Sequence, residues 1–200
     1  MDVSEEYLLH QAIQRHIKKI GIPDIVIANA GVSTGTLNGE REDLVTFKRM
    51  MDINLYGVMH TFLPFIHAFK KRKSGQLVGI ASVAGIRGLP GSGAYSASKA
   101  ALINYLESLR IEMLPFNIQV NTIAPGYIKT PMTHSNPYAM PFILEVDKAV
   151  TLFIKAIDQK KKFIIIPWQM NIVGKLMRLL PASVWDFLAK RGPKKLRAMI

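Results

Sequence analysis

The sequence predicts an α/β fold in which helices cover both faces of a doubly wound parallel sheet. Four short apolar runs alternate with segments of helical periodicity, and they span 24–28, 77–82, 118–123 and 163–166. Such alternation is typical of the strand–helix–strand units that build parallel sheets. Of the 200 residues, 49% are hydrophobic, which is enough to bury a core and excludes a disordered chain.

The first predicted strand follows an amphipathic helix. Apolar residues recur every three or four positions within 4–20, and Gly21-Ile22-Pro23 ends that pattern. The run 24–28 is β-branched and almost entirely apolar. It therefore predicts a strand that is buried on both faces.

Three further helices are predicted along the chain. The first covers 44–69, with an expected kink at Pro64, and ends at the basic cluster 70–73. Cations there suit the C-terminal end of a helix dipole. The other two helices cover 95–114 and 145–158.

The composition excludes several classes of protein. The chain has no cysteine, which rules out disulfide frameworks, thiolate metal sites and cysteine nucleophiles. Its five histidines show no metal-ligand spacing, so no metal site is predicted. The acidic start lacks the features of a secretory signal, and no apolar run is long enough to span a membrane. We expect a cytoplasmic protein, with peripheral membrane attachment as an open alternative.

Polar residues follow the predicted strands at their carboxyl ends, where ligands bind in open α/β sheets. Asn29 follows the first strand, Ser82 ends the second, and Pro125-Gly126 follows the third. Tyr95 and Lys99 are four residues apart and share one face of the predicted helix. A nearby cation favours a phenolate and lowers its pKa by about 1–3 units. These side chains therefore predict a proton-transfer site for a carbonyl or an alcohol.

These motifs, in this order, resemble the short-chain dehydrogenase/reductase family. They are Asn29-Ala30-Gly31, Asn54 within Asp52-Ile53-Asn54-Leu55-Tyr56-Gly57, Ser82, Tyr95-x-x-x-Lys99, and Pro125-Gly126 followed by Thr130. A Tyr-x-x-x-Lys pair alone occurs by chance in many proteins, whereas the ordered set is specific. The resemblance covers about residues 5–166. It implies a Rossmann-like fold and a reaction that interconverts an alcohol and a ketone or aldehyde with NAD or NADP.

The resemblance also implies a role for each matching residue. Tyr95 would be the general acid/base, Lys99 would lower its pKa and bind the nicotinamide ribose, and Ser82 would donate to the substrate oxygen. Asn54 would hold a water of a proton relay. The cofactor-binding residues would be Asn29, Ala30, Gly31, Tyr95, Lys99, Pro125, Gly126, Ile128 and Thr130. Taken singly, these residues are more often caps, turn formers or solvated charges, but their joint arrangement favours the catalytic interpretation.

The resemblance also implies a segment that this sequence does not contain. Members of the family begin with a strand, a Gly-rich turn and a helix that bind the cofactor pyrophosphate. No glycine precedes Gly21, and Gly31, Gly35 and Gly39 do not match that fingerprint. We expect the sequence to be a piece of a longer protein, with about 60–70 residues and three strands missing. The alternative is a genuine short form that cannot hold a dinucleotide.

The basic charge is concentrated in the C-terminal quarter. The formal net charge is +12, and residues 155–200 carry 11 of the 26 Lys and Arg residues but only two of the 14 acidic residues. We therefore divide the chain into a partial catalytic domain, 1–166, and a basic amphipathic helical extension, 167–200. The extension would be either a lid or dimer cover, or an interfacial anchor for anionic lipid that suits an apolar substrate. Nucleic acid is not an expected partner, because stacking aromatics do not accompany the charge.

Two hypotheses of function follow. The first is an NAD(P)-dependent oxidoreductase acting on a small carbonyl or alcohol, with Asn54, Ser82, Tyr95 and Lys99 as its catalytic set and an apolar or lipid-like compound among its candidate substrates. The second is a non-catalytic interaction module that attaches to a membrane through 168–200. In either case we expect a homo-oligomer that assembles through helices 44–69 and 95–114. The sequence does not fix the substrate, the choice between NAD and NADP, or the reaction direction.

Overall fold

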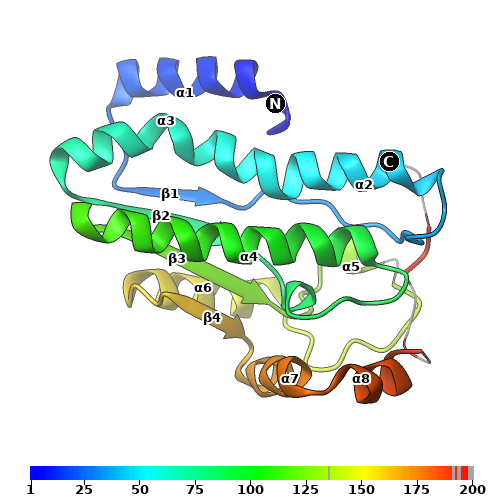
Figure 1. Ribbon diagram of the computed structural model, residues 1–200. Coiled ribbons are helices and arrows are strands. Elements are labelled where there is room, and N and C mark those ends of the chain that lie inside the picture. Colours follow the sequence, from blue (N-terminus) through cyan, green and yellow to red (C-terminus); the bar gives the residue numbers. More distant parts are fainter. Residues whose placement is uncertain (135, 191, 193–194, 198–200) are drawn as a thin grey trace.

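The computed structural model describes residues 1–134, 136–190, 192 and 195–197. Its centre is one parallel sheet with the strand order β1-β2-β3-β4 (Figure 1). The strands are β1 (Ile25–Ala28), β2 (Gly75–Ile80), β3 (Ile118–Pro125) and β4 (Phe163–Ile166). The α/β class and all four predicted strands are confirmed, with strand ends displaced by at most two residues.

Helices lie on both faces of this sheet, as the alternating pattern predicts. In Figure 1, α3 and α4 lie on one face and α6 lies on the other. The helices are α1 (Glu6–Ile20), α2 (Asp43–Met51), α3 (Gly57–Arg72), α4 (Gly93–Met113), α5 (Pro131–His134), α6 (Val146–Asp158), α7 (Trp168–Leu179) and α8 (Ala182–Ala189). Short 3₁₀ turns add η2 (Val83–Gly85) and η3 (Leu114–Phe116).

The helix predicted over 44–69 is continuous but not uniformly α-helical. A π-helical turn, η1 (Asp52–Tyr56), separates α2 from α3. α3 continues through Pro64, where the sequence predicts a kink. Asn54 lies in the π turn with its side chain completely buried. Such turns recur at functional sites, where they re-aim one side chain.

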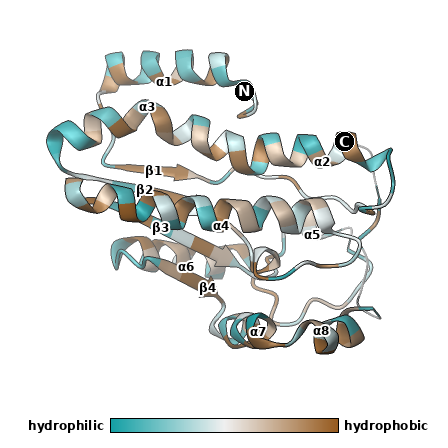
Figure 2. Cartoon of the chain, in the orientation of Figure 1, coloured by the Kyte–Doolittle hydropathy of each residue, from teal (hydrophilic) through white to brown (hydrophobic). Residues whose placement is uncertain are grey.

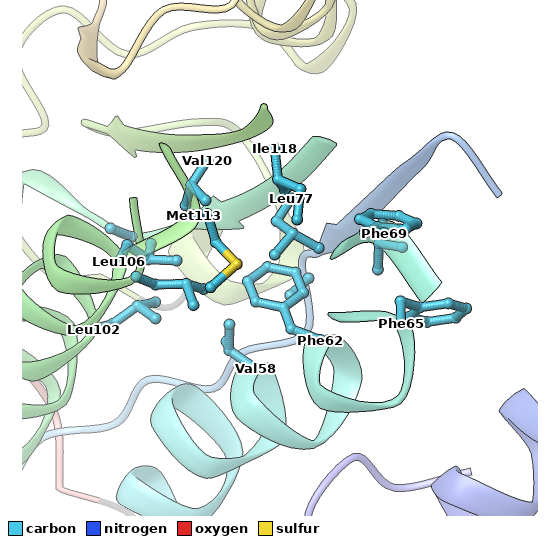
Figure 3. Packing of buried hydrophobic residues seen from close by; sticks show 14 of the residues in the cluster. Val58, Phe62, Phe65, Phe69, Leu77, Leu102, Leu106, Met113, Ile118 and Val120 are labelled. Carbon is cyan, nitrogen blue, oxygen red and sulfur yellow. The ribbon is translucent and has the colours of Figure 1, made fainter. Parts of the chain in front are cut away.

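Two hydrophobic layers cover the sheet, one on each face. Consecutive residues of a strand point to opposite faces, so Leu77 packs with α3 and α4 while Val78 packs with α6. Figure 3 shows the larger layer, in which Phe62 and Phe69 of α3 and Leu106 of α4 all pack over the strands. This packing fixes α4, and with it Tyr95 and Lys99, against the sheet.

The prediction for 24–28 is wrong in one respect. β1 is buried on one face only: Val26 and Ala28 are buried, whereas Ile25 and Ile27 are 42% and 50% exposed. The reason is that β1 is an edge strand that α3 covers on one face, while α6 contacts β3 and β4 on the other.

The segment after β4 forms two helices, α7 and α8, that lie beside the loop between β2 and α4. The guanidinium of Arg87 donates to the carbonyl oxygens of Met177 (2.8 Å) and Leu180 (2.7 Å) at the end of α7. It also lies over the ring of Trp185, whose indole N–H donates to Gly88 O (3.2 Å). The C-terminal helices therefore pack against this loop, while Arg191 and Lys194 of the basic extension lie outside the described residues.

Candidate active site

A cavity of about 490 Å³ opens at the carboxyl edge of the sheet. Its volume lies within the range of small-molecule sites. Every predicted cofactor-binding residue and three of the four predicted catalytic residues line it. Those residues are Asn29, Ala30, Gly31, Ser82, Tyr95, Lys99, Pro125, Gly126, Ile128 and Thr130.

Tyr95 and Ser82 meet at the centre of this wall. Tyr95 lies in the first turn of α4, and Ser82 follows β2, where its Oγ accepts the backbone N–H of Ala84 (3.1 Å) and caps η2. Ser82 is close enough to the Tyr95 hydroxyl for hydrogen bonding between them to lower the pKa of Tyr95. Two hydroxyls that share a hydrogen bond can both contact one substrate oxygen, which is the arrangement that a proton-transfer site requires.

The expected lowering of the Tyr95 pKa by Lys99 is not found. Burial raises the pKa of Tyr95 above its ordinary value of 10.0, and the hydrogen bond with Ser82 opposes this only in part. The amine of Lys99 is directed elsewhere, because its Nζ donates to the carbonyl oxygen of Ile80 (2.8 Å). Tyr95 is therefore protonated at neutral pH and can donate a proton.

Lys99 is a buried cation at the edge of β2. Only 4% of its surface is exposed, and burial lowers its pKa to about 8 because the charged form loses its hydration. At neutral pH the amine still carries its charge for most of the time. Lys99 is thus a charged group of the cavity wall without an ion-pair partner among the residues that the structure describes.

Asn54 does not reach the cavity wall. Its side chain lies behind it, where Oδ1 accepts the backbone N–H of Val32 (2.8 Å) and Nδ2 donates to Val32 O (2.9 Å) and to Ser98 Oγ (3.0 Å). Ser98 Oγ in turn donates to the carbonyl oxygen of Tyr95 (2.9 Å). The side chain therefore ties the loop after β1 to the turn of α4 that carries Tyr95.

Gly31 lies in the loop after β1, close to the buried amine of Lys99. A Cβ at this position would lie 3.2 Å from Asn54 Oδ1 and 3.5 Å from Lys99 Nζ. A side chain here would thus crowd both groups. The absence of one leaves the backbone open to a flat ring or a sugar along the cavity wall.

Sequence reasoning missed several residues of the cavity. Tyr127 and Tyr138 stack edge to face at its mouth, with ring centroids 6.4 Å apart, and Lys195 reaches it from the C-terminal segment. Tyr127 could have been found from its place beside the Pro125-Gly126 motif. Tyr138 and Lys195 carry no local signal, because their positions depend on how distant segments pack.

The comparisons with known proteins agree with this geometry. A family model described as short chain dehydrogenase matches residues 1–140. An uncharacterized oxidoreductase of Myxococcus xanthus is 36% identical over 191 residues, which cover 96% of this chain and 75% of that protein. A 3-oxoacyl-(acyl-carrier-protein) reductase of Chlamydia muridarum is 34% identical over 133 residues, 66% of this chain and 53% of the reductase.

Two solved structures are also similar. A short chain dehydrogenase from Burkholderia cenocepacia in complex with NADP superposes with a TM-score of 0.81, at 22% identity, over 94% of this chain and 78% of that one. A 4-hydroxyisoleucine dehydrogenase complexed with NADH has a TM-score of 0.68 at 27% identity, over 83% and 77% of the two chains.

The fold, the strand-edge site and these matches together define the class of protein: the chain belongs to the short-chain dehydrogenase family of oxidoreductases. It spans three quarters of the Myxococcus oxidoreductase and about half the length of the acyl-carrier-protein reductase.

Proposed function

We propose that the protein is an NAD(P)-dependent oxidoreductase that interconverts an alcohol and a ketone or aldehyde at the Tyr95 cavity. The observation that carries the proposal is the meeting of a protonated Tyr95, a hydrogen-bonded Ser82 and a buried cationic Lys99 on one cavity wall. Each of these residues alone is common in proteins. Together, Tyr95, Ser82 and Lys99 supply proton transfer, orientation and a positive charge at one place.

In the reduction direction, Tyr95 and Ser82 act on the carbonyl oxygen. Ser82 donates a hydrogen bond that orients this oxygen, and the Tyr95 hydroxyl transfers its proton as negative charge develops there. The phenolate that remains is disfavoured by burial and regains its proton from solvent. In the oxidation direction the same phenolate accepts the proton of the alcohol.

The residues around the site fit the nicotinamide half of a dinucleotide. Pro125, Ile128 and Thr130 form one wall beyond β3, and Gly31 leaves the opposite backbone open. When bound, the nicotinamide supplies or accepts the hydride. Asn29 and Ala30, at the end of β1, would lie toward the adenosine side. The complex of the 4-hydroxyisoleucine dehydrogenase with NADH supports the same class of cofactor.

The decisive experiment is replacement of Tyr95 by phenylalanine, which removes the proton donor and keeps the ring. We expect turnover of a carbonyl substrate with NAD(P)H to fall at least about 100-fold, the usual minimum for a general acid, with dinucleotide affinity almost unchanged. Tyr105→Phe, on the same helix but outside the cavity, is the matched control. Turnover that survives in the Tyr95 variant would refute the proposal.

The substrate is proposed to be apolar, and a membrane surface to be its source. Trp168, Ile172, Leu176 and Leu179 are exposed at helical spacing along α7, with cations such as Lys175 between them (Figure 2). Such a face suits the boundary between anionic headgroups and acyl chains. No helix of the described residues is long and apolar enough to cross a membrane.

Co-sedimentation with vesicles tests this attachment. We expect the protein to bind vesicles that contain anionic lipid and to release them when Leu176 and Leu179 are both changed to glutamate. Equal binding by the original and changed chains would rule out α7 as the anchor.

Self-association is proposed through the outer faces of α2, α3 and α4. Leu44, Val45 and Leu63 are exposed on the first two helices, and Ile111 is exposed on α4. These exposed apolar side chains on three helices are the observation that supports self-association there. Light scattering should show a dimer or tetramer that Leu63→Glu dissociates, whereas a monomeric starting protein would contradict the proposal.

A further inference from the structure

The cavity holds a second cation that the proposed mechanism does not use. Lys195 lines the same cavity as Tyr95 and Ser82, and its Nζ donates to the hydroxyl of Ser33 (2.9 Å). The charged side chains among the described residues that line the cavity are Lys99 and Lys195, both basic. The interior therefore carries positive potential that no lining carboxylate balances.

The backbone of Lys195 is held in place by contacts of the two residues that follow it in the chain. Leu196 O accepts the backbone N–H of Gly35 (2.9 Å), and the Arg197 guanidinium donates to Asp43 Oδ1 (3.0 Å). The other oxygen of Asp43 accepts the backbone N–H of Leu37 (2.7 Å). In Figure 1 the red end of the chain lies near the start of α2, where these contacts are made.

The fit between this segment and the loop depends on Gly35. A Cβ at Gly35 would lie 2.4 Å from Lys195 O and 2.6 Å from Leu196 O, both backbone atoms that cannot simply rotate away. At Gly39, in the same loop, a Cβ would meet nothing within 4 Å. The two glycines therefore form a matched pair, one needed for the contact and one not.

We propose that Lys195 binds an anionic group, a carboxylate or a phosphate, of the ligand that occupies the Tyr95 cavity. An amine held by backbone contacts can exchange its neutral partner, Ser33 Oγ, for an anion without losing its position. Burial lowers the pKa of Lys195, so an anion beside the amine favours its charged form and is itself bound more tightly. The inference rests on the proposed function only in placing the reacting atoms at Tyr95.

The other residues that line the cavity indicate which kind of molecule carries the anionic group. Ile80, Val83, Leu89 and Phe153 contribute apolar surface to the cavity. The matching ligand is an amphiphile with an apolar body and one acidic group, such as an oxidised aliphatic acid. The phosphates of the dinucleotide offer the same chemistry, so the test must separate the two sources.

Calorimetric titration of the purified chain with hexanoate and with its neutral amide, hexanamide, tests the inference without any turnover. We expect the chain to bind hexanoate about tenfold or more tightly than hexanamide, the usual contribution of a charge-assisted hydrogen bond. That preference should disappear in Lys195→Met and remain in Lys175→Met, which changes an exposed lysine of α7. Gly35→Ala should abolish it as well, while Gly39→Ala should not.

A parallel titration with NADH identifies the source of the anion. If Lys195→Met loses the preference for hexanoate over hexanamide and keeps its affinity for NADH, the subsite belongs to the substrate. Weaker NADH binding with an unchanged preference assigns it to the dinucleotide phosphates. If Lys195→Met changes neither, or if Gly35→Ala and Gly39→Ala behave alike, the inference is wrong. Because hexanoate binding does not require Tyr95 chemistry, this failure is distinct from a failure of the proposed reaction.

Discussion

Replacing Lys99 with methionine should make the free energy of unfolding less dependent on pH between 7 and 9.5. Burial lowers the pKa of Lys99 from 10.5 to about 8. Between these values the unfolded chain holds a proton that the folded chain has released, so stability rises with pH. At pH 7 burial of the charged amine costs about 3 kcal/mol, and at pH 9.5 about 1 kcal/mol, which makes the relief about 2 kcal/mol.

Urea unfolding followed by far-UV circular dichroism at pH 7, 8 and 9.5 measures this relief. The quantity to compare is the stability of the original chain minus that of Lys99→Met, because titration of the other groups largely cancels. We expect this difference to rise by about 2 kcal/mol in favour of the original chain as pH increases. For the exposed Lys175, the stability of the original chain minus that of Lys175→Met should not change with pH. A flat difference for Lys99 as well would refute the conclusion that burial sets its charge.

Three further substitutions and one control test the packing, all by urea unfolding at pH 7. Phe62→Ala, at a fully buried ring, should destabilise the protein by about 3–5 kcal/mol, and the control Leu8→Ala, at an exposed leucine of α1, by less than about 0.5 kcal/mol. Gly79→Ala would place a Cβ 2.5 Å from a methyl carbon of Leu106, so a loss of about 1–3 kcal/mol is expected. Ser98→Ala removes one acceptor from the buried Asn54 amide and should cost about 1–3 kcal/mol. Equal effects at Phe62 and Leu8, or none at Gly79 and Ser98, would contradict the packing described.

The sequence was sufficient where the structure depends on local patterns. Strand runs such as 118–123 and amphipathic helices such as 4–20 bury one face or both, and that requirement is visible in the periodicity. The catalytic wall was also predictable, because the carboxyl ends of parallel strands bring Asn29, Ser82 and Pro125 to one edge.

The remaining features depend on contacts between segments that are far apart in the chain. The π turn at Asp52–Tyr56 accompanies hydrogen bonds from Asn54 to Val32 and Ser98, which no local pattern encodes. The higher pKa of Tyr95 follows from burial, which the four-residue spacing to Lys99 cannot reveal. The one-sided burial of β1 required knowledge of which helix lies over which strand.

Because β1 is an edge strand, the protection of backbone amides from solvent differs between the strands of the sheet. Backbone groups on the outer side of an edge strand have no partner in the sheet, and Ile25 and Ile27 add exposed apolar surface beside them. Amide hydrogens of β1 should therefore exchange with deuterium by local fraying. Those of β2 and β3, which are paired on both sides, should exchange only through global unfolding. Local opening of the sheet would thus begin at its edge strands, and opening at β1 would disturb the part of the cavity wall formed by Asn29, Ala30 and Gly31.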